Sequence, residues 1–585
     1  MHIQKRTDLI RTALGKEKAD LVIVNGSLVN VYTGELLDGY GIAVRGERIA
    51  CVGKDVQHTV GPDTKVIDAA GKTVVPGFID SHTHLSIFCR ADEVLRYIGR
   101  GGTTTIVTEL IELYFTLGRE GIIAYLDSCK DQPLKIFGVV PPMVSLSSRA
   151  RENGIDKEKL GELLQREDIL GLGEVYWLPV INGDEKLLGL IEETIKAGKV
   201  AAGHSAGAKG QKLAAYTAAG VASCHEPITA GEAMERLRLG LYVLAREGET
   251  RRDLEAIAGI NHQELDLSRL VLVTDTASLR QIKDEGYMEV VVQKAIDLGF
   301  DPITSIQMAT INAARYYRMD DCLGGIAPGK YADMVIIPEL HKINAEYVIS
   351  SGRIISRGRK LLAEPRKHVF PEWTRQAIHI KKNFTAEDFI IRVPVGSDKA
   401  KVRVIELIDE LVTQETHLTV SPCQGKIKAD PQEDLLKIAC IDYQTEPVVQ
   451  FTGLVKGFGI KKGAIATTMT WDVTNITVVG VDEADLALAV NRIKELGGGA
   501  VVCAGGRIVV EQPLPIGAYI SDLPLEEVLQ QSDAFQSAAA KLGSPLENTH
   551  LTLMTLTSPA IPFFRICEEG LFNFRTNSKV GLMCD

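Results

Sequence analysis

The sequence lacks the cysteine pattern of a disulfide framework or of a structural zinc site. Its ten cysteines are scattered along 585 residues, and no two of them form a C-x-x-C pair. Scattered thiols fit a reducing compartment, where free cysteine serves as a small buried residue. The sequence therefore predicts an intracellular protein that is not held together by disulfides.

Long apolar runs and clustered positive charge are also missing. No stretch of eighteen uncharged apolar residues occurs, and residues 1–20 are polar and amphipathic, without the apolar core of a signal peptide. The formal charge is -11, and no basic stripe offsets it, so a nucleic acid or an anionic membrane would be repelled. We expect a cytoplasmic protein that binds a small molecule, and neither nucleic acid nor a membrane.

The length allows two to four domains, at about one domain per 150 residues. Residues 19–24 (ADLVIV) return late in the chain as residues 332–337 (ADMVII), and both runs read as β-strands. The simplest arrangement is a small composite β-sandwich made from residues 1–75 together with 325–365. Chance similarity between two strands is the alternative explanation.

The region between the two flanks, residues 76–324, alternates apolar runs with helical stretches, which is typical of parallel βαβ units. We predict eight strands, at residues 74–79, 103–108, 135–140, 169–172, 199–202, 220–223, 241–245 and 270–274. Eight strands in about 250 residues are typical of a (β/α)8 TIM-like barrel. An open doubly wound sheet is the competitor, but no G-x-G-x-x-G follows the first strand. A charged connector at 353–382 then leads to a C-terminal α/β domain, residues 383–585.

Two histidines stand out at the end of the first barrel strand, in V-V-P-G-F-I-D-S-H-T-H. Side chains of a strand alternate between its faces, so His82 and His84 point the same way. Two imidazoles on one face can share a metal ion, although such spacing also arises by chance in a chain with 12 histidines. The position favours a site, because active sites of these barrels lie at the C-terminal ends of the strands.

Other polar residues end the later strand runs in the same way: Glu174, His204, His225 and Asp275. If the barrel closes, all of them converge with the first histidine pair. Imidazole and carboxylate are suitable ligands for Zn, Mn or Fe ions, and a carboxylate can bridge two of them. Each residue has an ordinary alternative role, as a hydrogen-bonded core histidine, a charge at a helix N-terminus or an N-cap.

The strand P-G-F-I-D-S-H-T-H, the late strand A-P-G-K-Y-A-D-M-V-I-I and the order of the ligands resemble the amidohydrolase superfamily. The chain is similar to the bacterial adenine deaminases over nearly its whole length. The similarity includes G-L-G-E, G-H-S-A-G-A-K-G with the following S-C-H-E, and the C-terminal G-L-V-K-G-F-G-I-K-K-G-A-I-A and P-L-P-I-G.

The resemblance implies a binuclear divalent metal centre, with Mn or Fe favoured and Zn possible. His82 and His84 would bind one ion, His204 and His225 the other, with Glu174 bridging and Asp275 beside both. A water activated by the ions would attack C6 of a 6-aminopurine, most simply adenine, giving hypoxanthine and ammonia. Asp275 would transfer the proton to the leaving amine. Glu226 would either protonate a ring nitrogen or orient a ligand histidine. Such barrels usually pair, so we expect a homodimer.

This chain departs from the family pattern at several polar positions that are expected near the pocket: Ser86, residues 109–112, Cys224, Thr276, Tyr287 and residues 470–475. Substrate contacts are therefore assigned to Ser86, Glu109, Trp471 and Asp472. Because buried polar groups set substrate discrimination, we expect these changes to alter the substrate preference and not the hydrolytic chemistry.

Two alternatives stay open. The same centre could open the ring of a cyclic amide such as xanthine or a hydantoin, or the protein could be a non-catalytic scaffold with a vestigial site. Another zinc deaminase architecture needs H-x-E followed by P-C-x-x-C, and Pro422-Cys423-Gln424-Gly425 lacks the second cysteine.

Overall fold

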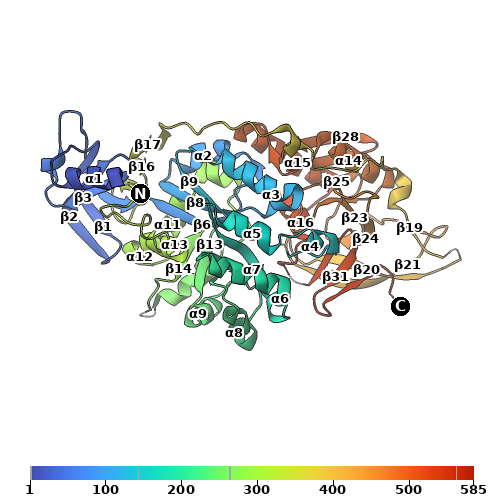
Figure 1. Ribbon diagram of the computed structural model, residues 1–585. Coiled ribbons are helices and arrows are strands. Elements are labelled where there is room, and N and C mark those ends of the chain that lie inside the picture. The colour runs from blue at the N-terminus through green and yellow to red at the C-terminus, as the bar shows by residue number, and fades with distance from the viewer. Residues whose placement is uncertain (1–2, 143, 263–264, 395, 562, 585) are drawn as a thin grey trace.

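The computed structural model describes residues 3–142, 144–262, 265–394, 396–561 and 563–584. It has three regions along its length: a β-sheet next to the N-terminus, a barrel in the middle and a second α/β region that holds the C-terminus (Figure 1). No helix within the described residues combines the length and the apolar character needed to cross a membrane.

The first region is one sheet assembled from both flanks of the barrel. After helix α1 (Ile3–Ala13), nine strands pair in the order β18-β17-β16-β15-β5-β1-β2-β3, with β4 also on β1. The two similar runs noted in the sequence become β1 and β15, which pair with the two sides of β5. The strands are β1 (Leu21–Asn30), β2 (Glu35–Arg45), β3 (Arg48–Gly53), β4 (Lys65–Asp68), β5 (Thr73–Pro76), β15 (Met334–Ile337), β16 (Tyr347–Ser350), β17 (Arg353–Arg357) and β18 (Lys360–Leu361).

The barrel contains the eight parallel strands predicted from the apolar runs. They form one group of five and one of three, and backbone hydrogen bonds join the groups at both seams: Ala222 N donates to Ala201 O at 2.9 Å, and Asp275 N to His82 O at 3.0 Å. The strands are β6 (Phe78–Thr83), β8 (Thr103–Glu109), β9 (Lys135–Val140), β10 (Ile169–Tyr176), β11 (Val200–His204), β12 (Ser223–Cys224), β13 (Tyr242–Arg246) and β14 (Leu270–Val273).

Helices follow the barrel strands and bury their apolar faces against them (Figure 1). The longer ones are α2 (Ala91–Ile98), α3 (Ile111–Ser128), α5 (Lys157–Leu164), α7 (Glu185–Lys196), α8 (Gly210–Ala218), α9 (Ala230–Arg238), α11 (Met288–Asp297), α12 (Pro302–Met308) and α13 (Ile311–Tyr316). Short helices α4 (Ser148–Glu152), α6 (Trp177–Ile181) and α10 (Leu254–Ile257) lie in the loops at the strand ends.

The run at 74–79, predicted as one strand, is divided at Gly77. Its first half is β5 of the flanking sheet and its second half is β6 of the barrel. Pro76 has no N–H to donate to a ladder, and a Cβ on Gly77 would lie 2.3 Å from Thr104 Oγ1. The Pro-Gly pair therefore lets the chain leave one sheet and join the other.

The C-terminal region is an eight-stranded, mainly antiparallel sheet in the order β21-β20-β24-β23-β26-β25-β27-β28. Helix α14 (Glu483–Leu496) begins at the N-cap Asp482 and ends at Gly497, which adopts the left-handed conformation. The strands are β20 (Ala400–Leu407), β21 (Thr413–Val420), β23 (Leu436–Asp442), β24 (Gln450–Lys456), β25 (Ala464–Thr467), β26 (Asn475–Gly480), β27 (Gly499–Ala504) and β28 (Arg507–Pro513).

Other strands and helices complete this region. They are the pair β19 (Ile391–Arg392) and β22 (Lys426–Ile427), helices α15 (Leu525–Leu542) and α16 (Thr549–Thr555), and the sheet β30 (Phe564–Cys567), β31 (Gly570–Asn573) and β32 (Ser578–Val580). The predicted connector includes β17 and β18 at its start, and then runs past the barrel, where Arg366 N donates to Gln132 Oε1 at 2.9 Å (Figure 1).

The C-terminal region is attached to the mouth of the barrel. Strand β7 (Phe88–Cys89), a few residues after the first histidine pair, pairs in parallel with β29 (Ile520–Ser521). Buried side chains of the C-terminal region, among them Met469 and Tyr519, belong to the same hydrophobic cluster as the barrel. The strand ends where the predicted site lies are therefore covered by a second part of the chain.

Gly171 tests how tightly the barrel strands approach one another. A Cβ at this position would lie 1.9 Å from Val200 O, a backbone atom that cannot move aside. We expect Gly171→Ala to lower the free energy of unfolding by about 1–3 kcal/mol or more, measured by urea denaturation. Gly161→Ala is the control, because its Cβ would meet nothing nearer than Glu193 Oε1 at 3.7 Å, and alanine favours the helix. Equal stability of Gly171→Ala and the wild type would contradict this packing.

Candidate metal centre and active site

The six side chains predicted as metal ligands come together at the C-terminal ends of the barrel strands. His82 is the last residue but one of β6, His84 directly follows that strand, Glu174 lies on β10 and His204 ends β11. The other two lie just beyond strand ends: His225 directly follows β12, and Asp275 is two residues after β14. All six side chains are largely buried, so the barrel closure seen above places them around one point.

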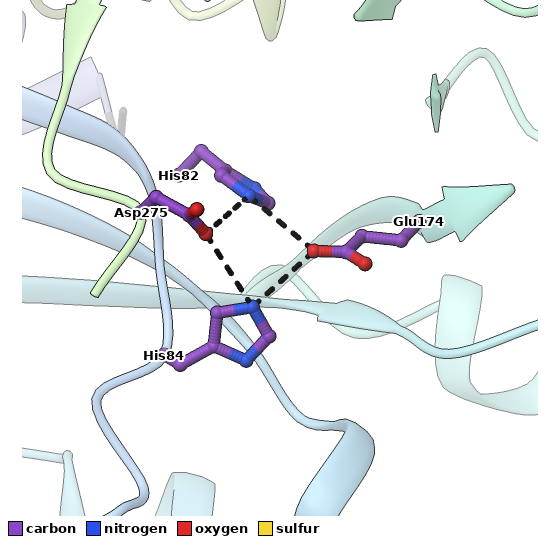
Figure 2. Close-up of side chains that lie close together, drawn as sticks. All are labelled: His82, His84, Glu174 and Asp275. Carbon is purple, nitrogen blue, oxygen red and sulfur yellow. Dashed lines mark hydrogen bonds and ion pairs between the residues drawn. The ribbon is translucent and has the colours of Figure 1, made fainter. Parts of the chain in front are cut away.

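Four of these side chains face one another, as Figure 2 shows. Glu174 Oε1 lies 3.5 Å from His82 Nε2 and 3.2 Å from His84 Nε2. Asp275 Oδ1 lies 3.3 Å and 3.8 Å from the same two nitrogens. Ligands about 2.0–2.2 Å from a tetrahedral or octahedral ion are separated by about 3–3.5 Å, so these distances fit a shared ion.

Glu174 also belongs to a second group, with His204 and His225, whose donor atoms all lie within 4.8 Å of one another. His225 Nε2 is 3.7 Å from the same carboxylate oxygen, Glu174 Oε1. One carboxylate therefore stands between two sets of potential ligands. In addition, His82 Nε2 is buried and has no hydrogen-bonding partner among the described residues. A buried nitrogen without a partner is costly, and a metal ion would satisfy it.

The electrostatics of this cluster also suit a cation. Burial alone would keep Glu174 neutral, but His82 and His84 hold its pKa well below the usual value. Burial likewise opposes charge on His204, yet Glu226 raises the pKa of that imidazole to about 9. The carboxylates therefore draw protons onto their neighbours, and divalent cations can supply the same positive charge.

Glu109 and Glu112 lie behind the first histidine pair. Glu109 Oε1 is 3.5 Å from His82 Nδ1, and Glu112 Oε1 accepts from His84 Nδ1 at 2.7 Å. A carboxylate on one ring nitrogen fixes the orientation of the imidazole and leaves the other nitrogen free for a metal. Ser86 donates to Glu112 Oε2 at 2.8 Å. Glu109 and Ser86, the first two side chains expected to contact substrate, lie behind the ligand histidines and do not line the cavity described below.

Glu226 faces the second pair of histidines and a buried arginine. Its Oε1 lies 3.2 Å from Nε2 of both His204 and His225 and accepts from Arg246 Nη1 at 2.6 Å. The same Nη1 is 3.4 Å from Asp275 Oδ2, while Nε and Nη2 of Arg246 donate to Asp253 Oδ2. Arg246 thus joins the two predicted acid–base carboxylates and is itself held by Asp253.

Arg246 and Asp253 were missed by the sequence analysis, and Glu112 was included there only within residues 109–112, without a role. A signal existed for Arg246, because it ends the seventh apolar run just as His204 ends the fifth. Arginine is not a metal ligand, so a pattern of metal-binding side chains at strand ends does not include it. Glu112 lies in the first turn of α3, beyond any strand pattern, and the sequence gives no sign of its contact with His84.

A cavity of about 540 Å³ opens over the cluster and is lined by His84, Glu174, His204, His225, Glu226, Arg246 and Asp275. The C-terminal region supplies part of its wall, including Trp471 and Asp472, the other two side chains expected to contact substrate. Asp472 accepts hydrogen bonds from Ser558 at 2.5 Å and Tyr176 at 3.2 Å. Burial raises the pKa of Asp472 to about 7.

The remaining departures from the family pattern have different surroundings. Thr276 and Tyr287 line a neighbouring cavity, and Thr474 donates to Asp442 at 3.0 Å, away from the cluster. Cys224 Sγ accepts from Ser205 Oγ at 2.9 Å beneath the second histidine pair. These positions shape the surroundings of the cluster and leave its ligand set intact.

Comparison with known proteins supports this arrangement. Residues 73–355 match the model of the amidohydrolase family, and residues 410–578 match that of the adenine deaminase C-terminal domain. The chain is 37% identical to "Adenine deaminase" of Moorella thermoacetica over 98% of both chains. It is 35% identical to "Adenine deaminase" of Clostridium botulinum over 99% of this chain and 97% of the other. The chain belongs to the adenine deaminase family.

Among solved structures, the chain is similar to the β-aspartyl dipeptidase of Fervidobacterium islandicum, with 17% identity and a TM-score of 0.47. This similarity covers 60% of the present chain and 100% of the dipeptidase. The amidohydrolase match covers the barrel and part of the composite sheet, and the second family match covers most of the C-terminal region. A divalent metal site follows from the amidohydrolase match together with the His, Glu and Asp cluster.

Arg246 offsets the charge of three carboxylates in a buried place, so its removal should destabilise the protein. We expect Arg246→Met to lower the free energy of unfolding by about 3 kcal/mol, as when one partner of a buried ion pair is removed. Urea denaturation of chelator-treated protein measures this without compensation by bound cations. The double variant Arg246→Met with Asp253→Asn removes both partners of one pair and should regain part of the loss. An unchanged unfolding midpoint in the single variant would contradict the network.

Proposed function

We propose that the protein hydrolyses adenine to hypoxanthine and ammonia at a binuclear divalent metal centre. The observation that carries the proposal is the position of Glu174, shared by two sets of metal-binding side chains at the floor of one cavity. The named relatives, similar over almost the whole chain, support adenine as the substrate. The comparisons do not favour the ring-opening or the scaffold alternative.

His82 and His84 would hold one ion, His204 and His225 the other, and Glu174 would bridge them, with Asp275 beside both. Nitrogen and carboxylate donors suit Mn, Fe or Zn, and we favour Mn or Fe. When bound, the ions supply the Lewis acidity that makes a water molecule nucleophilic near neutral pH.

Asp275 is the proposed proton carrier. Its Oδ1 faces the cluster, where it can accept a proton from the attacking water and pass it to the leaving amine. Its Oδ2 lies 3.4 Å from Arg246 Nη1, which fixes the carboxylate plane. For Glu226 we favour the orienting role over protonation of a ring nitrogen, because Arg246 and two histidines already engage its Oε1.

The purine would lie between the cluster and the C-terminal region. Trp471 offers an aromatic surface to a planar ring, and Asp472 offers a carboxyl group to a ring N–H. Ile111, Leu411 and Val412 complete an apolar wall. A ring is thus recognised by groups from both halves of the chain.

Metal analysis tests the proposed ligand set independently of activity. We expect about two divalent ions per chain in protein purified without chelator, measured by mass spectrometry. Glu174→Ala should lose both ions because it is shared, whereas His204→Ala should retain about one. His341→Ala, at an exposed histidine outside the cluster, is the matched control and should retain both. A full metal content in Glu174→Ala would refute the bridging role.

Ammonia release from adenine tests the reaction, with Mn, Fe and Zn supplied separately. His204→Ala should abolish turnover, and Asp275→Asn should lower kcat by about 10²–10⁴, the usual contribution of a general acid–base group. A ring-opened product without ammonia would instead support the cyclic amide alternative. If no aminopurine is turned over by metal-loaded protein, the proposed function is wrong.

A further inference from the structure

A cavity of about 600 Å³ lies next to the catalytic cavity, and we call it the basic cavity. Tyr176 and His204, whose ring centroids are 4.8 Å apart, line both cavities. Helices α4, α6, α7 and α8 on the barrel side and strand β31 of the C-terminal region contribute to its wall (Figure 1). Sites for small molecules typically have volumes of about 300–1,000 Å³, so this cavity is large enough for a ligand of its own.

Three cationic side chains from different helices line the basic cavity: Arg151 of α4, Lys186 of α7 and Lys212 of α8. Backbone carbonyls position two of them, because Arg151 Nη1 donates to Ser145 O at 3.0 Å and Lys186 Nζ donates to Arg151 O at 3.1 Å. None of the three forms an ion pair with a carboxylate in the described part of the chain. Unpaired cations around one space attract an anion.

The net charge of this lining is positive, although the chain as a whole carries -11. Among the described residues of the lining, Asp184 is the only acidic one, and its Oδ1 accepts from Leu187 N at 3.0 Å as the N-cap of α7. Three cations and one carboxylate leave an excess of two positive charges, if the proposed metal ligand His204 is left out. A phosphate monoester carries about -1.5 to -2 near neutral pH, so its charge would complement the lining.

Half-buried aromatic rings lie in the same wall as the cations. They are Trp177 of α6, Phe572 of β31 and Phe574 just after that strand. The two phenylalanine rings have centroids 4.7 Å apart, and Lys212 Nζ lies 5.7 Å from the centroid of the Trp177 ring. Nucleobases stack on exposed aromatic faces of this kind. A ligand that combines a phosphate with a planar base would therefore use both features of the cavity.

We propose that the basic cavity binds a nucleoside monophosphate at a site distinct from the catalytic cavity. The phosphate lies among Arg151, Lys186 and Lys212, whose N–H groups donate to its oxygens, as guanidinium and ammonium groups do. The base lies against the aromatic rings, of which Trp177 is held in place by donation from its Nε1 to Ala206 O at 2.8 Å. Because the nucleotide stays on its own side of Tyr176, a purine can occupy the catalytic cavity at the same time.

Equilibrium dialysis of inosine 5′-monophosphate (IMP) against the metal-loaded protein tests the proposal. Excess hypoxanthine is present to fill the catalytic cavity, and we expect one IMP to bind per chain under these conditions. Ribose 5-phosphate should bind at least roughly fivefold more weakly, because it has no base to stack. Inosine should bind at least roughly tenfold more weakly, because it has no phosphate to accept charge-assisted hydrogen bonds.

Single substitutions of the lysines locate the binding site. Lys186→Met and Lys212→Met each remove one cation but keep an unbranched apolar side chain, so each should raise the Kd of IMP at least roughly fivefold and leave that of inosine unchanged. Lys196→Met is the matched control, at an exposed lysine of the same helix as Lys186 that pairs with Glu192 outside the cavity. It should keep the wild-type Kd. Melting temperatures show that all three variants are folded.

Several results would overturn the proposal. Displacement of IMP by hypoxanthine would place the nucleotide in the catalytic cavity, and wild-type affinity in both Lys186→Met and Lys212→Met would place it elsewhere on the protein. Ribose 5-phosphate or inosine binding as tightly as IMP would mean that the ligand is not a nucleoside monophosphate, and absence of IMP binding would refute the site. None of these measurements follows turnover of adenine, so failure of the proposed function would be seen separately.

Discussion

Negative charge concentrated in a buried place is the constraint on which the site depends. Glu109, Glu112, Glu174 and Asp275 are each buried at the barrel mouth, and Glu226 nearly so. Burying several carboxylates together is costly unless positive charge lies among them. Arg246 supplies part of that charge to Glu226 and Asp275, and the imidazoles and their metal ions would supply the rest. The barrel positions these groups because the ends of parallel strands meet at one edge.

The C-terminal region completes the site instead of standing apart from it. The parallel pair β7 and β29 ties it to the chain just after the first histidine pair, and Trp471 and Asp472 extend over the metal cluster. Asp472 is in turn fixed by Tyr176 of β10, two residues from Glu174. In the proposed function, substrate recognition and water activation come from different parts of the chain, joined by the hydrogen bond between Tyr176 and Asp472.

The barrel strands and the six ligand side chains could be predicted from the sequence, because both depend on patterns of neighbouring residues along a strand. Alternation along β6 puts His82 and His84 on one face, and apolar runs followed by polar residues identify Glu174, His204, His225 and Asp275 as strand ends. Periodicity gives no guidance beyond the end of a strand, so Ser86 was singled out only as a departure from the family pattern, and its hydroxyl donates to Glu112 in the structure. Glu109 does end a strand, but it points to the rear nitrogen of His82.

Sequence patterns do not indicate contacts between segments that are distant along the chain. Phe88 pairs with Ile520, and nothing in either segment indicates the other. Trp471 and Asp472 were identified through family resemblance rather than from the pattern of residues around them. Arg246 ends a strand and could have been found from that position, but only metal ligands were expected at the strand ends.

Anomalous X-ray diffraction from crystals of manganese-loaded protein tests the central claim most directly. The account predicts two strong anomalous peaks at the barrel mouth, both in contact with the carboxylate of Glu174. A single peak, or peaks that lie away from Glu174, would contradict the shared carboxylate on which the proposed mechanism depends.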